Sequence, residues 1–438
     1  MKKLIEKLKN ILSDNFFKNT GWLIFDKVFH MALSIFITGY VARYLPEAQY
    51  GMLSYGLAFT TFFTALCKLG IDAIIVNEII KNRGKTGEIL GTTIVLRLVS
   101  ALLSIICTTL FVLLLRPNQA IVFVITTVQS LSLVFMALDT FDFYFQSKLI
   151  SKYSALARMI SYPLVCLLRI VLVLTKADVT FFAAAVVLDS LTIGIVSYIF
   201  YKKSEPQRLH FSINMSKHLL KQSYHFIPSA LMIALYTQMG KIMLGSLAAN
   251  SDMENGFYEP AVLIANMWTF IPLALIDSGR PIIMTLKNQK EETKYNSRYT
   301  QLYSTVIWLS IVAGIGFLIF SPLAINIVFG AKYAPSANIL RVLIWARLFS
   351  IVGTTRGIWM VCEDKGKYVK YFVGIGAVLN FTLNFIFIPY FGALGAAIAI
   401  LLTEIGASVI APLFFKKTRP IGKIMLDSFL LKGIRKKR

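Results

Sequence analysis

The feature that most constrains this chain is a series of long apolar runs separated by short polar segments. Each run has about 18 to 28 mostly apolar residues, enough for a helix to cross a hydrocarbon layer of ~30 Å. Lipid offers the backbone no hydrogen-bond partners, so spanning segments of this kind are helical. We predict about twelve transmembrane helices, at residues 21–44, 51–76, 88–115, 118–145, 152–175, 178–201, 218–249, 254–286, 299–329, 334–361, 367–389 and 392–415.

The composition agrees with an integral membrane protein. Hydrophobic residues make up 56% of the 438 residues and charged residues 15%, whereas a soluble protein has about a quarter of its residues charged. The net charge of +23 would suggest nucleic acid in a soluble protein, but here the basic residues lie between the apolar runs. We therefore predict an all-α integral membrane protein whose basic loops set its topology and contact anionic membrane lipids, with no nucleic-acid partner.

The basic residues between the runs are concentrated in alternate loops. One set of loops is rich in lysine and arginine and comprises residues 81–85, 148–152, 202–221, 287–298 and 365–370. The other set has only Arg43, Arg116, Lys176 and Lys332. Because cytoplasmic loops carry an excess of Lys and Arg, we predict that the first set and both termini face the cytoplasm.

The order of the runs predicts two halves of six helices each. A shift of 205 residues places Gly256 on Gly51 and Ile276-Asp277 on Ile71-Asp72, which indicates an internal repeat. Halves with an even number of spans are parallel repeats, related by an axis along the membrane normal. The expected parts are an amphipathic basic N-terminal segment, an N-lobe, a cytoplasmic linker, a C-lobe and a basic cytoplasmic tail, at residues 1–20, 21–201, 202–217, 218–415 and 416–438.

Short motifs in a fixed order give the chain a family resemblance. The motifs of the first half are Val41-Ala42-Arg43-Tyr44-Leu45-Pro46-Glu47, Tyr50-Gly51 and Leu69-Gly70-Ile71-Asp72. Those of the second half are Lys241-Ile242-Met243-Leu244-Gly245, Gly256-Phe257-Tyr258, Phe329-Gly330, Tyr333, Asn380, Asn384, Ile388-Pro389, Gly392 and Gly395-Ala396-Ala397. Over essentially its whole length the chain resembles the polysaccharide-transport (Wzx-type) flippases of the multidrug/oligosaccharidyl-lipid/polysaccharide exporter (MOP) superfamily. It departs from their pattern at Asn77 and Gly240, where such proteins often carry Arg and Asp.

This resemblance implies two six-helix lobes around a central, partly hydrated cavity. It implies a flippase that moves a polyprenyl-diphosphate-linked oligosaccharide repeat unit by alternating access, from the cytoplasmic to the outer face of the bacterial plasma (inner) membrane. We further expect H⁺ or Na⁺ as the coupling ion, and polysaccharide polymerase and chain-length proteins as partners. Whether the product is O-antigen, capsule or another polysaccharide stays open.

An ionisable side chain inside a span raises the free energy of membrane insertion by roughly 2.5–3.5 kcal/mol, so its presence there requires a reason. Basic residues inside the predicted spans are therefore candidates for a substrate site. The candidates are Lys27, Lys68, Arg97, Arg158, Arg169, Arg280 and Arg347. Guanidinium groups offer bidentate donors to phosphate oxygens, which suits a diphosphate. Arg158 and Arg169 are three helical turns apart and share one face. The alternative for residues near a span end is snorkelling to the interface, which applies to Lys27, Arg158, Arg280, Arg341 and Arg356.

Acidic residues and one histidine inside the spans are candidates for coupling or gating. They are Asp26, His30, Asp72, Asp189, Asp277 and Glu404. Lys68 and Asp72 stand four residues apart, which is typical of a static salt bridge. Asp26, Lys27 and His30 form either a packed polar group or a gate. Asp189 and Glu404 have no cation close in the sequence, and a buried carboxylate of this kind holds a proton, as a coupling residue requires.

Features that the sequence lacks argue against several classes of protein. Gly84-Lys85-Thr86 resembles the end of a phosphate-binding loop, but Ile79 occupies the position of its first glycine. The histidines and cysteines show no metal or catalytic spacing, so we predict no enzyme, no metal and no cofactor. Two alternatives remain. A cation-coupled multidrug exporter of the same superfamily would need an acid-rich cavity, and a membrane polysaccharide polymerase or ligase would need a long outer loop.

Overall fold

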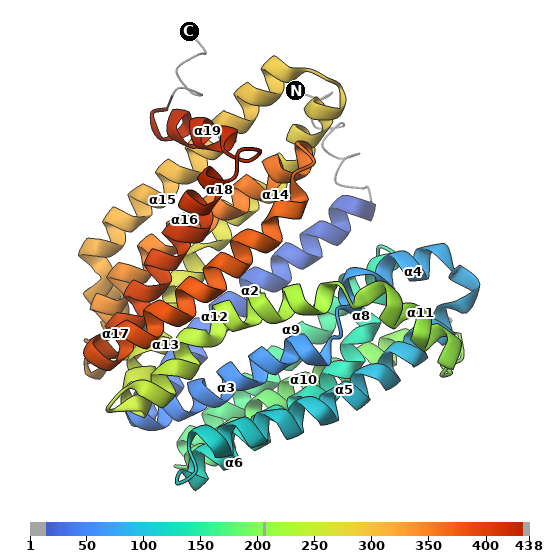
Figure 1. The fold of residues 1–438 in the computed structure, drawn as a ribbon. Helices are drawn as coiled ribbons and strands as arrows, with labels where there is room; N and C mark the ends of the chain where they lie inside the picture. Colours follow the sequence, from blue (N-terminus) through green and yellow to red (C-terminus); the bar gives the residue numbers. More distant parts are fainter. Residues whose placement is uncertain (1–14, 205–206, 432–438) are drawn as a thin grey trace, which may run out of the picture. The chain divides into compact units, whose positions relative to one another are not determined.

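The computed structural model describes residues 15–204 and 207–431, and within these ranges its regular structure is entirely helical (Figure 1). The long helices are α2 (Asn15–Tyr44), α3 (Glu47–Cys67), α5 (Thr86–Leu115), α9 (Lys152–Leu174), α10 (Val179–Lys203), α12 (Phe226–Leu247), α13 (Ser251–Trp268), α14 (Phe270–Asn288), α15 (Glu292–Phe329), α16 (Ser336–Cys362) and α17 (Val369–Ile405). The shorter ones are α4 (Ile75–Lys81), α6 (Ala120–Ser130), α7 (Ser132–Phe135), α8 (Thr140–Ser147), α11 (Ile213–Ser223), α18 (Ala411–Phe414) and α19 (Pro420–Phe429).

These helices coincide with the predicted spans, so the all-α membrane fold is confirmed. Nine helical segments of the described part are long and apolar enough to cross a membrane. One of them, Gly366–Phe414, is interrupted at Gly392 and contains two of the predicted spans. α2 and α3 occupy the first two predicted spans. Each of the predicted spans therefore corresponds to helical structure.

A sharp break divides α17 where one predicted span ends and the next begins. Gly392 has φ 54° and ψ −131°, a conformation that is open to glycine but strained for a residue with a Cβ. The carboxylate of Glu254 lies where a Cβ at position 392 would point. Its Oε2 accepts a hydrogen bond from the backbone N–H of Ala393 at 2.6 Å. The Glu254 side chain of α13 thus supplies a hydrogen-bond acceptor and a negative charge to the free N–H groups that begin the helix after the break.

Gly392→Ala is expected to destabilise the protein by about 1–3 kcal/mol, because alanine must adopt a strained backbone and displace the Glu254 carboxylate. The measurement is the apparent melting temperature in detergent. The control is Gly374→Ala on the same helix, where a Cβ meets no atom within 4 Å. This change should be neutral or stabilising, since alanine favours a helix over glycine by about 1 kcal/mol. Equal melting temperatures would show that the break tolerates a side chain.

The helices form two compact units, each described here by itself. The first contains the described residues up to Pro46 and Tyr55–Ala234, and the second contains Glu47–Ser54 and the described residues from Leu235 onward. The unit boundaries fall at the start of α3, inside α3 and inside α12. The described residues of the predicted linker, 202–217, belong to the first unit, where Ser212 caps α11. The predicted lobes, residues 21–201 and 218–415, have different bounds from these two units. The division into lobes stays a prediction.

A reciprocal contact between α3 and α13, within the second unit, supports the internal repeat. Gly51 lies against the backbone of Asp252, and Gly256 lies against the backbone of Glu47. A Cβ on either glycine would clash with a backbone carbonyl oxygen of the other helix. The shift of 205 residues turns one of these contacts into the other. Such interchange is expected where two repeats meet across a two-fold axis.

The two ends of the chain are described only in part. Residues 1–14 of the predicted N-terminal segment and the closing basic run Arg435–Arg438 lie outside the described residues. Within the tail, α19 buries Ile421 and Met425 and packs on α15. The indole N–H of Trp308 on α15 donates to the carbonyl oxygen of Phe429 at 3.0 Å. The described part of the predicted basic tail therefore has apolar residues packed against the protein.

Candidate functional site

An arginine held between two aspartates lies inside the first unit. Arg158 on α9 donates to Asp26 Oδ2 at 3.2 Å and also to Asp142 Oδ2. Asp26 lies on α2 and Asp142 on α8, and both are buried. The consecutive helices α8 and α9 thus meet the distant helix α2 at one guanidinium group. Arg158 is engaged with these carboxylates instead of snorkelling to an interface.

A second polar group adjoins this arginine. His30 on α2 packs against the ring of Tyr162, with 4.2 Å between the ring centroids. The hydroxyl of Ser161 donates to Asp189 Oδ1 at 2.6 Å. His30 interacts electrostatically with both Asp189 and Asp26. The fold therefore brings together three of the predicted coupling residues, two from α2 and one from α10.

Asp72 bridges two of the predicted cations. Its carboxylate lies 3.1 Å from Lys68 Nζ, which confirms the salt bridge expected from their spacing, and it also pairs with Arg97. Arg97 is fully buried on α5. Its guanidinium donates to Thr140 Oγ1 at 3.2 Å and lies over the ring of Phe143. The residues predicted to bind substrate and those predicted to couple or gate are thus direct neighbours here.

Two aspartates that the sequence analysis did not single out connect these groups. Asp139 ends a 3₁₀ turn (Met136–Asp139) inside the predicted span 118–145, and Asp142 follows in α8. Asp139 interacts electrostatically with Asp142, Arg97 and Arg158. The signal that selected Asp189, an acid within a predicted span, would also have selected these two residues. The groups around Arg158 and around Arg97 therefore belong to one network.

Glu404, the predicted coupling residue of the last span, is buried in the second unit. Its carboxylate accepts hydrogen bonds from Tyr236, Ser350 and Ser408, the last at 3.2 Å. Arg347 of α16 interacts with it electrostatically and supplies the cation that the sequence did not reveal. The Nε of Arg347 is buried and has no hydrogen-bond partner among the residues that the structure describes. This arginine therefore has a donor available for a ligand or a water molecule.

A further ion pair of the second unit joins three helices. Lys241 on α12 pairs with Glu259 on α13, and the hydroxyl of Ser54 on α3 donates to the same carboxylate at 2.8 Å. The Asn255 side chain donates to the carbonyl oxygen of Lys241 at 3.1 Å. Neither Lys241 nor Glu259 was a predicted site residue. Ser54 and Glu259 are separated by 205 residues, the same interval that relates the two contacting glycines.

The remaining predicted site residues lie in other surroundings. On α14, Arg280 Nη2 is 3.7 Å from Asp277 Oδ1, and both side chains are exposed. Lys27 is exposed on α2, next to the buried Asp26. Arg169 lies on α9 and interacts electrostatically with His30. The seven predicted cations belong to both units: Arg280 and Arg347 are in the second and the other five are in the first.

Two arginines of α16 bond to backbone carbonyl groups. Arg356 donates to the carbonyl oxygens of Ala407 at 3.1 Å and Ser408 at 2.7 Å. Both acceptors belong to the π-helical turn Gly406–Ile410, whose wide winding leaves carbonyl groups free to accept other donors. Arg341 donates from Nε to the carbonyl oxygen of Leu318 at 3.0 Å. These contacts give Arg356 and Arg341 structural roles and distinguish them from Arg347.

The arrangement of helices is similar to that of two solved membrane transport proteins. A multidrug resistance MATE family transporter in an inward-facing conformation matches with a TM-score of 0.69, over 92% of this chain and 96% of that chain, at 13% identity. The lipid II flippase MurJ in an inward closed conformation also matches with a TM-score of 0.69, over 93% and 90% of the two chains, at 16% identity. At such low identity the similarity defines the fold alone.

Residues 16–271, more than half of the sequence, match the family described as Polysaccharide biosynthesis protein, and the chain belongs to this family. It is 24% identical over 188 residues to a Haloferax volcanii protein named as the low-salt glycan biosynthesis flippase Agl15. It is 25% identical over 217 residues to a Shigella dysenteriae protein named as an O-antigen transporter. These matches span 43% and 48% of this chain but only 39% and 52% of the relatives' lengths. The family predicted from the sequence motifs is confirmed.

Proposed function

We propose that this protein is a flippase that moves a polyprenyl-diphosphate-linked oligosaccharide repeat unit across a bacterial plasma membrane by alternating access. Membership of the Polysaccharide biosynthesis protein family is the observation that carries the proposal. Relatives named as an O-antigen transporter and as a glycan biosynthesis flippase support it. The cargo moves from the cytoplasmic to the outer face, and both termini face the cytoplasm, as the distribution of basic loops favours. Polymerase and chain-length proteins then receive the cargo.

The cations within the membrane-spanning helices suit this cargo. A diphosphate carries at least two negative charges, and an apolar layer excludes it unless those charges are compensated. Arg347 is the group best placed to bind phosphate in the second unit, because its buried Nε has no partner among the described residues. The Nε of Arg356 is also without a partner there, but Arg356 already donates to two backbone carbonyl oxygens. Glu404 interacts with the same arginine and is our proposed site for H⁺ or Na⁺. Ion binding at Glu404 and phosphate binding at Arg347 would then be energetically linked.

The acidic interior of the first unit favours a second candidate, a cation-coupled multidrug exporter. The aspartates of this interior are Asp26, Asp72, Asp139, Asp142 and Asp189. A MATE transporter and MurJ match with the same TM-score, so the fold does not separate the two candidates. However, three of the aspartates pair with Lys68, Arg97 or Arg158, which leaves less negative charge for an organic cation. The flippase is therefore the better supported function, and the fold is that of a transporter and not of an enzyme.

The test is the pool of polyprenyl-linked sugar in cells that lack this gene, with its sidedness probed by a membrane-impermeant reagent. We expect intact lipid-linked oligosaccharide to accumulate on the cytoplasmic side. Normal delivery of repeat units to the outer face would overturn the proposal. Accumulation of cationic dyes in the same cells, with normal delivery of sugar, would favour the multidrug exporter.

Arg347→Ala is expected to reduce delivery of the lipid-linked sugar by about tenfold or more, because it removes a buried charged donor. Arg341→Ala is the matched control on the same helix, since Arg341 bonds to a backbone carbonyl group outside the proposed site. It should keep delivery close to that of the unmodified protein. The readout is surface polysaccharide restored in cells lacking the chromosomal gene, at equal protein levels. Normal delivery by both variants would exclude a cationic site at Arg347.

A further inference from the structure

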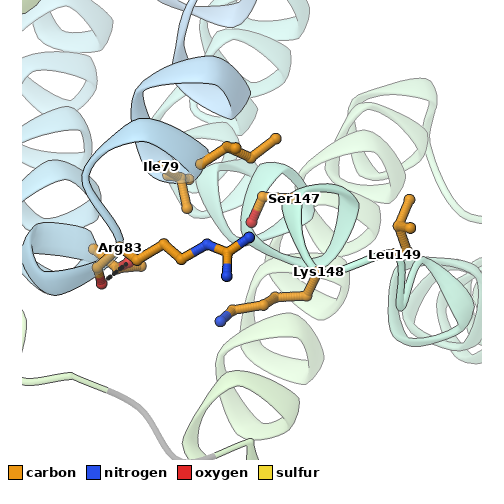
Figure 2. A pocket seen from close by; sticks show the side chains of 7 residues that line it. Ile79, Arg83, Ser147, Lys148 and Leu149 are labelled. Atoms are coloured by element: carbon orange, nitrogen blue, oxygen red, sulfur yellow. Dashed lines mark hydrogen bonds between the residues drawn. The ribbon is translucent and has the colours of Figure 1, made fainter.

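A separate cationic pocket lies at one end of the first unit, outside the buried network. Arg83, Lys148, Thr86 and Ser147 form its polar wall, and the cavity has a volume of about 260 Å³. Figure 2 shows the guanidinium group of Arg83 and the ammonium group of Lys148 extending into the same space, with the Ser147 hydroxyl beside them. Arg83 lies between α4 and α5, and Lys148 follows α8. Tertiary structure thus brings together two cations that are distant in the sequence.

The backbone beneath these two cations is held in place from both sides. The carbonyl oxygen of Arg83 accepts hydrogen bonds from Thr86 Oγ1 at 3.0 Å and from Gln207 Nε2 at 2.8 Å. On the opposite wall, Leu149 has a left-handed φ of 57° and closes the end of α8 through a hydrogen bond to Gln146. The backbone at both residues is therefore fixed. The side chains of Arg83 and Lys148 are exposed and can adapt to a ligand.

The charge of this pocket is not compensated within the described structure. None of the residues that line it is acidic. Neither Arg83 nor Lys148 forms an ion pair with another described residue. Two like charges that share a cavity repel each other, so an anion placed between them is strongly favoured. An arginine with an adjacent lysine and hydroxyl group matches the oxygens of a phosphate group.

The remaining wall of the pocket is apolar. Ile79, Ile80 and Leu149 line it, and the side chains of Ile80 and Leu149 are 46% and 52% exposed. Exposed aliphatic side chains next to two cations are suited to a ligand with a charged head and a hydrocarbon chain. Both loops that supply the cations belong to the set that we propose to face the cytoplasm. The pocket would then lie at the headgroup level of that leaflet, where anionic lipids are present.

We propose that this pocket binds the phosphate group of a membrane lipid. The phosphate oxygens contact Arg83, Lys148 and the Ser147 hydroxyl, and the start of the acyl chain lies on Ile80 and Leu149. This site is distinct from the proposed cargo site at Arg347. The bound lipid would hold the loop before α5 against the end of α8.

The test measures binding of phosphatidylglycerol to the full-length protein in an uncharged detergent, next to diacylglycerol with the same chains and to inorganic phosphate. We expect saturable binding of phosphatidylglycerol that is weakened about tenfold by the double change Arg83→Gln and Lys148→Gln. The matched control is Lys81→Gln with Lys85→Gln, which removes the same charge from exposed residues of the same loop that do not line the pocket. It should weaken binding less than twofold.

Each other outcome would count against the proposal. Equal weakening by both double variants would mean that a diffuse basic surface, and not this pocket, attracts the lipid. Diacylglycerol binding with equal affinity would show that the phosphate is not recognised. Inorganic phosphate that binds as tightly, and is lost in the Arg83 and Lys148 variant, would assign the pocket to a soluble phosphate. The melting temperature of each variant must match that of the unmodified protein, so that lost binding is not caused by unfolding.

Discussion

Arg158→Ala is expected to destabilise the protein by about 3–5 kcal/mol, the usual cost of removing one partner from a buried ion pair. Its guanidinium group contacts Asp26 and Asp142, and both carboxylates would be left buried without it. The membrane interior makes this cost large, because water cannot replace the lost partner. The measurement is the apparent melting temperature of the purified protein in detergent. A substantially lower value is the expected result.

The matched control is Arg341→Ala, because Arg341 bonds to a backbone carbonyl group and a neutral amide and leaves no carboxylate unpaired. It should lower the melting temperature much less. Adding Asp142→Asn to Arg158→Ala should restore part of the stability, since the neutral amide costs less to bury than an unpaired carboxylate. If Arg158→Ala melts like the unmodified protein, the network does not hold α2, α8 and α9 together.

Gly256→Ala is expected to destabilise the protein strongly, because the new Cβ would collide with the carbonyl oxygen of Glu47. That atom belongs to a helix backbone, so α3 and α13 must move apart. Overpacking of this kind costs about 1–3 kcal/mol where side chains can adjust, and backbone adjusts less easily. We expect a lower melting temperature and less monodisperse protein in size-exclusion chromatography.

The reciprocal geometry allows an internal check. Gly51→Ala should have an effect similar to that of Gly256→Ala, because its Cβ would meet the carbonyl oxygen of Asp252 in the equivalent place. The double variant should lose less than the sum of the two, since both changes force the same helices apart. Gly316→Ala, where a Cβ meets nothing within 4 Å, is the control and should be neutral or stabilising. Normal stability of both single variants would rule out a tight crossing.

Much of the fold could be predicted because hydropathy and length are local properties. The spans expected at 88–115, 152–175 and 178–201 became α5, α9 and α10 with boundaries that differ by two residues or less. Other spans differed more from the prediction, two of them for identifiable reasons. Residues 218–223, expected at the start of a span, belong to α11, which Ser212 caps as a separate amphipathic helix. The span expected at 254–286 is divided at Thr269 into α13 and α14.

The candidate site could be predicted only as a set of residue types. Cost arguments about charges in a membrane selected Arg158, Asp26 and Glu404 as candidates, because any ionisable group in a span requires a reason. They could not assign partners beyond the four-residue interval that joins Lys68 to Asp72. Asp142 was missed although it lies in a predicted span, and it proved to be a direct partner of Arg158.

The sequence by itself therefore determined an all-α membrane fold, the positions of its helices and the family, because lipid imposes helical spans whose length and polarity can be read directly. The tertiary structure decided which charges meet. Asp26 and Arg158 are 132 residues apart, and Ser54 and Glu259 are 205 apart, so their contacts depend on how whole helices pack. Helix packing follows from the shapes of many side chains at once, and no local pattern encodes it.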